Sequence, residues 1–245
     1  MVNPPVVLRF PGLRREPLRC LRYTTAGGER IGPIVVHAGM HTAATDGDRT
    51  LNLAIFDLDH TLLSGDSDYL WGCFLVEHGL VDAGRFAEAN ERFYRDYQAG
   101  TLDITAYLRF SLEPLTRFDL TALHGWRQRF IDERIRPLVR TAGLEAVRWH
   151  RGQGHQVLII TATNAFVTRP IAGLFEVDVL LATEPELVAD RYTGGWLGLP
   201  TFREGKVRVF EDWCARLEQP PQDVWFYSDS HNDLPLLERV THPVA

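Results

Sequence analysis

A short apolar run that ends in two aspartates constrains the fold of this chain more than any other feature. Residues 51–56 are mostly apolar and stop at Asp57, as a buried parallel strand does when it leads into a loop. Asp59 follows two residues later, so one loop carries two carboxylates. Polar residues at the carboxyl end of a buried strand indicate an α/β sheet with its functional site at that edge.

Alternating strand and helix patterns support the same class of fold. We expect further strands at 156–160, 178–182 and 224–227, and helices at 138–151, 164–174 and 206–217. Helix-length connections between buried strands predict a Rossmann-like parallel sheet with helices on both faces. Residues 191–195 resemble the tip of a hairpin between two short strands.

The block between these two parts of the sheet has the pattern of an all-helical insertion. Helical spacing covers 69–79, 84–98, 103–112 and 119–135. One aromatic stripe there, which we expect to be a packing face, consists of Phe86, Phe93, Tyr94 and Tyr97. The chain therefore divides into an α/β core of residues 51–68 and 138–245 and a helical insertion of residues 69–137.

The first fifty residues have a different character. Prolines and glycines interrupt them, and residues 34–36 form only one short candidate strand. We expect residues 1–50 to be an irregular extension. Met40 lies just ahead of the first convincing element, so translation could also begin there.

Composition narrows the classes of partner. The 245 residues carry a formal charge of −6 and no block of basic residues, so we expect no nucleic acid partner. No apolar run approaches the roughly 20 residues that cross a bilayer, so we expect no membrane span. Three widely spaced cysteines favour a cytoplasmic protein with reduced thiols. The oligomeric state does not follow from the sequence.

Polar groups follow three of the expected strands, and these ends should meet at one edge of the sheet. They are Asp57 with Asp59, then Thr161, then Asp229 with Asp233. Converging carboxylates repel one another unless a cation lies between them, and oxygen ligands suit Mg²⁺. Lys206 would add positive charge and Thr161 a hydrogen-bond donor, as phosphoryl transfer requires.

Four motifs then resemble those of one family. FDLDHTLL at 56–63 resembles the first motif of the haloacid dehalogenase-like hydrolase superfamily, and LIITAT at 158–163 its second. The Gly205-Lys206 pair is similar to the third motif. YSDSHNDLPLL at 227–237 resembles the fourth, in a form found in the phosphoserine-phosphatase-like branch, which includes histidinol-phosphatase-like proteins. The resemblance covers residues 51–245, and the helical insertion matches the cap domain of that branch.

The resemblance implies a role for each residue that matches. Asp57 would attack phosphorus and carry the phosphoryl group, and Asp59 would act as general acid and base. Mg²⁺ would be held by the side chains of Asp57 and Asp229 and by the backbone carbonyl of Asp59, with Asp233 in support. The phosphoryl oxygens would be bound by Thr161, Lys206 and Asn232.

The implied substrate is a small phosphate ester, similar to phosphoserine or histidinol phosphate. Asp59 favours phosphatases and phosphomutases, because the dehalogenases of the superfamily lack this residue. Asp66 stands where phosphoserine phosphatases carry a glutamate for the substrate amino group, so it is a candidate for specificity. In the cap, Arg92, Arg95 and Arg109 should lie on solvated faces, although one could reach a substrate carboxylate.

Two other functions stay open on the same residues. A phosphotransferase or mutase would pass the phosphoryl group to an alcohol instead of water. A catalytically dead domain would only bind a partner. The family also continues with a further strand and helix where residues 242–245 stand, so we expect an uncovered sheet edge there.

Overall fold

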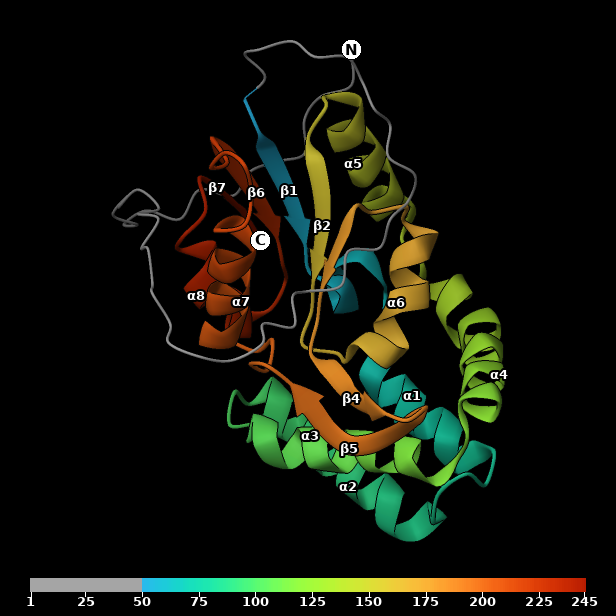
Figure 1. Ribbon diagram of the computed structural model, residues 1–245. Helices are drawn as coiled ribbons and strands as arrows, with labels where there is room; N and C mark the ends of the chain where they lie inside the picture. Colours follow the sequence, from blue (N-terminus) through green and yellow to red (C-terminus); the bar gives the residue numbers. More distant parts are fainter. Residues whose placement is uncertain (1–49) are drawn as a thin grey trace.

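A five-stranded parallel sheet forms the centre of the structure, a computed structural model that describes residues 50–245 (Figure 1). The strand order is β3-β2-β1-β6-β7. The strands are β1 (Asn52–Phe56), β2 (Gln156–Ile160), β3 (Val179–Leu181), β6 (Asp223–Tyr227) and β7 (His242–Val244). The predicted α/β class with a parallel sheet is confirmed. The expectations for residues 1–49 lie outside the described residues.

Strand β1 lies in the middle of the sheet because both of its faces are apolar. Leu53 and Ile55 pack into one hydrophobic cluster, and Ala54 and Phe56 pack into a second cluster on the opposite face. All four side chains are almost fully buried. A strand of this kind needs a helical layer on each side.

Helices supply both layers (Figure 1). On one face lie α5 (Thr141–Gly152) and α6 (Ala165–Leu174), and on the other lie α7 (Glu204–Cys214) and the short α8 (Leu234–Leu237). Helix α5 begins three residues later than expected because a separate 3₁₀ turn, Arg136–Leu138, contains Pro137. The remaining short turns are Leu58–Leu62, Glu113–Arg117, Ile131–Ile135 and His231–Asp233.

Four helices form the cap, which lies beyond the carboxyl ends of β1 and β2 (Figure 1). They are α1 (Ser67–Glu77), α2 (Ala83–Gln98), α3 (Ile104–Leu112) and α4 (Leu120–Phe130). An aspartate precedes each helix and accepts hydrogen bonds from backbone amides of the first turn; these aspartates are Asp66, Asp82, Asp103 and Asp119. Such caps satisfy amides that have no partner inside the helix, so they define where each helix begins.

An antiparallel hairpin, β4 (Glu184–Val188) with β5 (Arg191–Leu197), lies beside the cap. The predicted hairpin tip at 191–195 is wrong, because those residues lie inside β5. The turn is at Ala189 and Asp190, whose φ angles are 48° and 59°. Two successive positive φ angles are typical of tight hairpin turns, and the usual Asn-Gly signal for them is missing here.

The final residues pair with the sheet. Residues Trp225 to Tyr227 of β6 align in parallel with residues His242 to Val244 of β7. Strand β7 is itself the edge strand of the sheet, so the sheet edge that we expected lies at residues 242–244. Among the described residues, none of the helices combines the length and apolar character that a membrane span requires.

Candidate active site

The loop after β1 places Asp57 at the carboxyl end of the sheet. The backbone N–H of Asp57 donates to the carbonyl of Tyr227 at 2.9 Å, which extends the pairing of β1 with β6. The carboxylate is only 4% exposed, and Lys206 Nζ donates to its Oδ1 at 2.8 Å. Burial raises the pKa of Asp57 well above its ordinary value, although the Lys206 charge acts in the opposite direction.

Lys206 lies in the first turn of α7, and its side chain joins two carboxylates. Its Nζ also donates to Asp233 Oδ2 at 2.8 Å, and Ser228 Oγ donates to the same oxygen at 2.8 Å. Burial opposes the charge on Lys206, but Asp233 and Asp57 together raise its pKa above the ordinary value. The ammonium group therefore stays charged between Asp57 and Asp233.

Close backbone packing explains why a glycine, Gly205, precedes Lys206. A Cβ atom at this position would lie 2.0 Å from the carbonyl oxygen of Pro200. Only glycine permits this close approach of the two backbone segments. The contact sets the start of α7 and hence the position of Lys206.

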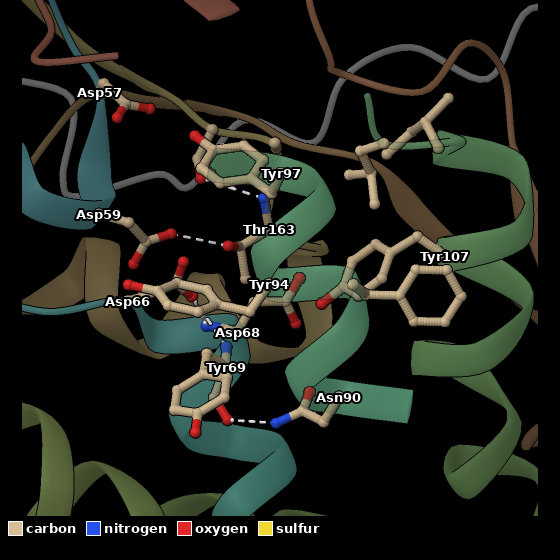
Figure 2. Close-up of a pocket in the computed structure, with 15 residues that line it drawn as sticks. Asp57, Asp59, Asp66, Asp68, Tyr69, Asn90, Tyr94, Tyr97, Tyr107 and Thr163 are labelled. Carbon is tan, nitrogen blue, oxygen red and sulfur yellow. Dashed lines mark hydrogen bonds between the residues drawn. The ribbon is translucent and has the colours of Figure 1, made fainter. Parts of the chain in front are cut away.

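Asp59 is held by hydrogen bonds from two different elements. Its Oδ1 accepts from the backbone N–H of Ser67 at 2.7 Å. Its Oδ2 accepts from Thr163 Oγ1 at 2.7 Å (Figure 2). Burial raises the pKa of Asp59 to about 6. A general acid and base works best with a pKa near the operating pH, so this environment suits proton transfer.

Thr161 and Thr163 lie in the loop that follows β2. Thr161 is 1% exposed and lines the pocket, and its Oγ1 accepts from the backbone N–H of Thr163 at 3.1 Å. Because its oxygen is used as an acceptor, the Thr161 hydroxyl can direct its proton into the pocket. The hydroxyl is thus free to donate a hydrogen bond to a ligand in the pocket.

Asp229 follows β6 and faces the loop that carries Asp57. Thr61 Oγ1 donates to Asp229 Oδ1 at 2.8 Å. Asp229 is exposed, in contrast to the buried Asp57. The loop after β1 therefore starts at the buried Asp57 and is bonded through Thr61 to the exposed Asp229.

Asn232, a predicted phosphate contact, is engaged in other bonds. Its Oδ1 accepts from Arg203 Nε at 3.1 Å, and its Nδ2 donates to the carbonyl of Tyr97 at 3.3 Å. The side chain is buried and does not line the pocket. In this arrangement Asn232 joins the core to the cap.

The predicted magnesium ligands have suitable chemistry. In residues 50–245, no three acidic, histidine or cysteine side chains converge into a metal cluster. The predicted ligands are a smaller set, namely two carboxylates and one backbone carbonyl. Two site carboxylates, Asp57 and Asp233, contact the ammonium group of Lys206, and Asp59 and Asp229 lie in the loops that follow β1 and β6. Oxygen donors with excess negative charge fit Mg²⁺, which binds a few carboxylates and keeps several waters.

A pocket runs from Asp57 into the cap (Figure 2). Its empty volume is about 550 Å³, including the open mouth. The core contributes Asp57, Asp59 and residues 161–163. The cap contributes Asp66, Asp68, Tyr69, Asn90, Phe93, Tyr94, Tyr97, Leu102, Ile104 and Tyr107. None of these fifteen lining residues is basic.

Carboxylates and tyrosines dominate the cap end of this pocket. Asp66 accepts from the backbone N–H groups of Asp68 and Tyr69 at 3.0 and 2.8 Å, so it caps α1 as well as lining the pocket. Asp68 accepts a hydrogen bond from the Tyr107 hydroxyl. Burial raises the pKa of Asp66 to about 6 and the pKa of Asp68 to about 7. Both groups are therefore short of positive partners.

The sequence did not predict that tyrosines of α2 line the cap end of the pocket. The aromatic stripe was expected to be a packing face, and Phe86 and Phe93 are buried. Tyr94 and Tyr97 are only half-buried, and together with Phe93 they line the pocket. Hydroxyl groups on an apolar stripe could have signalled this difference. The three arginines considered for a substrate carboxylate, Arg92, Arg95 and Arg109, are exposed and do not line the pocket.

Comparisons with known proteins identify the family of this chain. The family model described as haloacid dehalogenase-like hydrolase matches residues 54–238. The chain is 43% identical over 198 residues to a histidinol-phosphatase of Neisseria meningitidis, covering 79% of this chain and 89% of that protein. It is 27% identical over 219 residues to a phosphoserine phosphatase of Mycobacterium tuberculosis, covering 87% of this chain and 71% of that protein.

Solved structures show the same fold. A protein of unknown function from Bordetella pertussis is 41% identical, with a TM-score of 0.75 over 80% of this chain and 89% of that one. A substrate-bound phosphoserine phosphatase is 15% identical, with a TM-score of 0.60 over 80% of this chain and 86% of that one, which is a likeness of fold alone. The predicted resemblance is confirmed: the chain belongs to the haloacid dehalogenase-like hydrolase family.

Proposed function

We propose that this hydrolase is a phosphatase whose substrate is a small phosphate ester with a basic group and no carboxylate, such as histidinol phosphate. The observation that carries this proposal is the composition of the pocket, in which Asp66 and Asp68 occupy the cap end and no lining residue is basic. The carboxylate of phosphoserine would meet like charges there, whereas an amine or imidazole would meet acceptors. The 43% identity to a protein named histidinol-phosphatase supports the same choice.

Asp57 acts first, as the nucleophile. Lys206 engages Oδ1 of Asp57, so Oδ2 attacks phosphorus in line with the leaving oxygen. An oxygen–phosphorus bond to Asp57 forms while the ester bond breaks. Asp59 gives its proton to the leaving alkoxide, which departs as the neutral alcohol.

Water completes the reaction in the second half. Asp59, now a carboxylate, takes a proton from a water molecule as its oxygen attacks phosphorus. The bond to Asp57 breaks, and inorganic phosphate leaves. The hydrogen bonds from Ser67 and Thr163 support this role, because they hold both oxygens of Asp59 in place for the two proton transfers.

The remaining residues bind the phosphoryl group. Mg²⁺ would be held by Asp57, Asp229 and the backbone carbonyl of Asp59, and when bound it neutralises phosphoryl charge. Thr161 donates a hydrogen bond to a phosphoryl oxygen, and Lys206 adds charge beside it. An inert binding domain would not need an ammonium group buried between Asp57 and Asp233, so catalysis is the better interpretation.

The test is phosphate release by the purified protein from histidinol phosphate, phosphoserine and a generic aryl phosphate. With Mg²⁺, we expect kcat/KM for histidinol phosphate to exceed that for phosphoserine by about tenfold or more, since one buried charge conflict is worth at least that factor. EDTA should abolish release from all three. A preference for phosphoserine would overturn the assigned substrate, and full activity in EDTA would overturn the metal requirement.

A further inference from the structure

Three hydrogen bonds connect the C-terminal end of cap helix α2 to the core. The Arg203 guanidinium donates through Nη2 to the carbonyl of Gly100. The Nδ2 of Asn232 donates to the carbonyl of Tyr97 at 3.3 Å, and the Tyr97 hydroxyl lies 3.3 Å from Ser230 Oγ. Arg203 Nε also donates to Asn232 Oδ1 at 3.1 Å, which links the two core loops to each other. We call Tyr97, Gly100, Arg203, Ser230 and Asn232 the latch.

The two core loops of the latch also carry the chemistry. Arg203 lies immediately before α7, three residues ahead of Lys206. Asn232 lies directly before Asp233, which accepts from Lys206. The latch therefore connects the cap to the two loops that also carry Lys206 and Asp233, while the Lys206–Asp233 pair keeps its own bonds to Asp57 and Ser228.

The backbone of Arg203 shows that its side chain is held in place at a cost. Its φ and ψ angles are 51° and −122°, a region that glycine adopts readily and that residues with a Cβ atom avoid. Such a conformation persists only where contacts of the side chain outweigh the strain. The bonds to Gly100 and Asn232, together with the stacking of the guanidinium on Phe202, are those contacts.

On the cap side of the latch, Gly100 packs tightly against side chains of the core. Gly100 has a φ of +69°, and a Cβ atom there would lie 2.8 Å from His231 Nε2 and 3.0 Å from Arg203 Nη2. A methyl group at residue 100 would therefore displace the ends of the His231 and Arg203 side chains and disturb the bond from Arg203 to the Gly100 carbonyl. Glycine at this position lets the end of α2 settle on the loops.

We propose that Arg203 is a positioning residue that holds the cap closed by bonding Gly100 of the cap and Asn232 of the core. It acts through these partners and does not touch the substrate. The kinetic part of this inference rests on the proposed function, because a substrate that reaches Asp68 needs the closed cap. The structural part does not, because closure can be measured without any substrate.

The first experiment replaces Arg203 with glycine, which removes the side chain and also relieves the backbone strain. We expect amide hydrogen exchange at residues 97–101 to accelerate by about tenfold or more, because a charge-assisted hydrogen bond is lost. KM for histidinol phosphate should rise about tenfold, while kcat/KM for the aryl phosphate changes little. The thermal midpoint should fall only slightly, since relief of strain offsets most of the lost contacts.

Ala189→Gly is the matched control for strain. Ala189 also has a positive φ, 48°, but lies in the hairpin turn and outside the latch. This variant should gain stability without changing KM or the exchange of residues 97–101. If it changed them as Arg203→Gly does, strain relief and not the latch would be the cause.

The second experiment compares Gly100→Ala with Gly79→Ala. Both glycines end cap helices with positive φ, +69° and +64°, but a Cβ atom at residue 79 would meet nothing within 4 Å. Both variants should lose similar stability from backbone strain, and only Gly100→Ala should accelerate exchange and raise KM. Equal kinetics in the two variants, or unchanged exchange in Arg203→Gly, would overturn the proposal. If the wild type does not hydrolyse histidinol phosphate, the proposed substrate fails while the exchange results still decide the latch.

Discussion

The two ends of the pocket treat their carboxylates in opposite ways. At the core end, Asp57 shares the ammonium group of Lys206, and both oxygens of Asp59 accept hydrogen bonds from Ser67 and Thr163. At the cap end, Asp66 and Asp68 have only backbone amides and a tyrosine hydroxyl as partners. The core end therefore has a positive charge beside Asp57 before any ligand arrives, and the lining of the cap end has none.

This difference assigns separate tasks to the two ends. A compensated and rigidly bonded end suits chemistry, which needs groups that are already in position. An under-compensated acidic end gains most from a ligand that brings positive charge, and so it suits selection of the substrate. Changes at the core end should affect all substrates alike, whereas changes at the cap end should depend on the substrate.

Asp57→Asn should have the largest effect and should act on every substrate. The amide retains the shape and an acceptor for Lys206 but cannot attack phosphorus. We expect kcat to fall by roughly 10⁴-fold or more for both histidinol phosphate and the aryl phosphate. Steady-state phosphate release measures this, with urea unfolding as the check that the fold is intact. Residual activity on one substrate only would contradict a common nucleophile.

Lys206→Met should break the compensation of the core end. Asp57 and Asp233 would be left buried without their cation, which costs about 3–5 kcal/mol in the free energy of unfolding. Urea denaturation measures the loss. The matched control is Arg239→Met, which removes an exposed pair with Glu211 at 3.8 Å and should cost under about 1 kcal/mol. Equal losses in the two variants would show that the buried network contributes nothing special.

Asp68→Asn should act on selection and not on chemistry. We expect KM for histidinol phosphate to rise about tenfold, with kcat/KM for the aryl phosphate unchanged, because one buried charge partner of the basic group is lost. Asp66→Asn is the matched variant, since asparagine still caps a helix while removing the charge. The variant with the larger KM identifies the carboxylate that meets the basic group. An equal loss of kcat/KM with the aryl phosphate would contradict the assignment of substrate selection to the cap end.

The smallest expected effect is a pH dependence of the increase in KM that Asp68→Asn causes. Burial raises the pKa of Asp68 to about 7, so the group is mostly protonated at pH 6 and charged at pH 8. Only the charged form attracts a basic group, so the ratio of KM between Asp68→Asn and wild type should grow severalfold from pH 6 to pH 8. Titration of the substrate itself cancels in the ratio. A flat ratio would mean that Asp68 does not titrate in this range.

Several features could be read from local pattern alone. The run before Asp57 predicts β1 because a strand buried on both faces must be continuously apolar. Aspartates ahead of helical segments mark where the cap helices begin, as Asp82 and Asp103 do. The order of Asp57, Thr161, Lys206 and Asp229 indicates a shared edge, since parallel strands end on the same side of a sheet.

Other features depend on which surfaces meet. The partners of Asp59 include Thr163, which is 104 residues away, and Arg203 bonds Gly100 across 103 residues. Helical periodicity tells which face of α2 is apolar, but not that Tyr94 and Tyr97 border a cavity while Phe86 does not. The hairpin turn at Ala189 was missed because its residues lack the usual turn signal and adopt positive φ only within the assembled hairpin.

The sequence by itself thus determined the sheet, the helical insertion and the family, because strand burial, helix caps and motif order are local properties of the chain. Only the tertiary structure decided that Asp68 faces Tyr107, that Asn232 joins the cap, and that the pocket has no basic lining residue. These follow from how the cap packs on the carboxyl edge of the sheet, and long-range packing leaves no periodic mark in a single sequence.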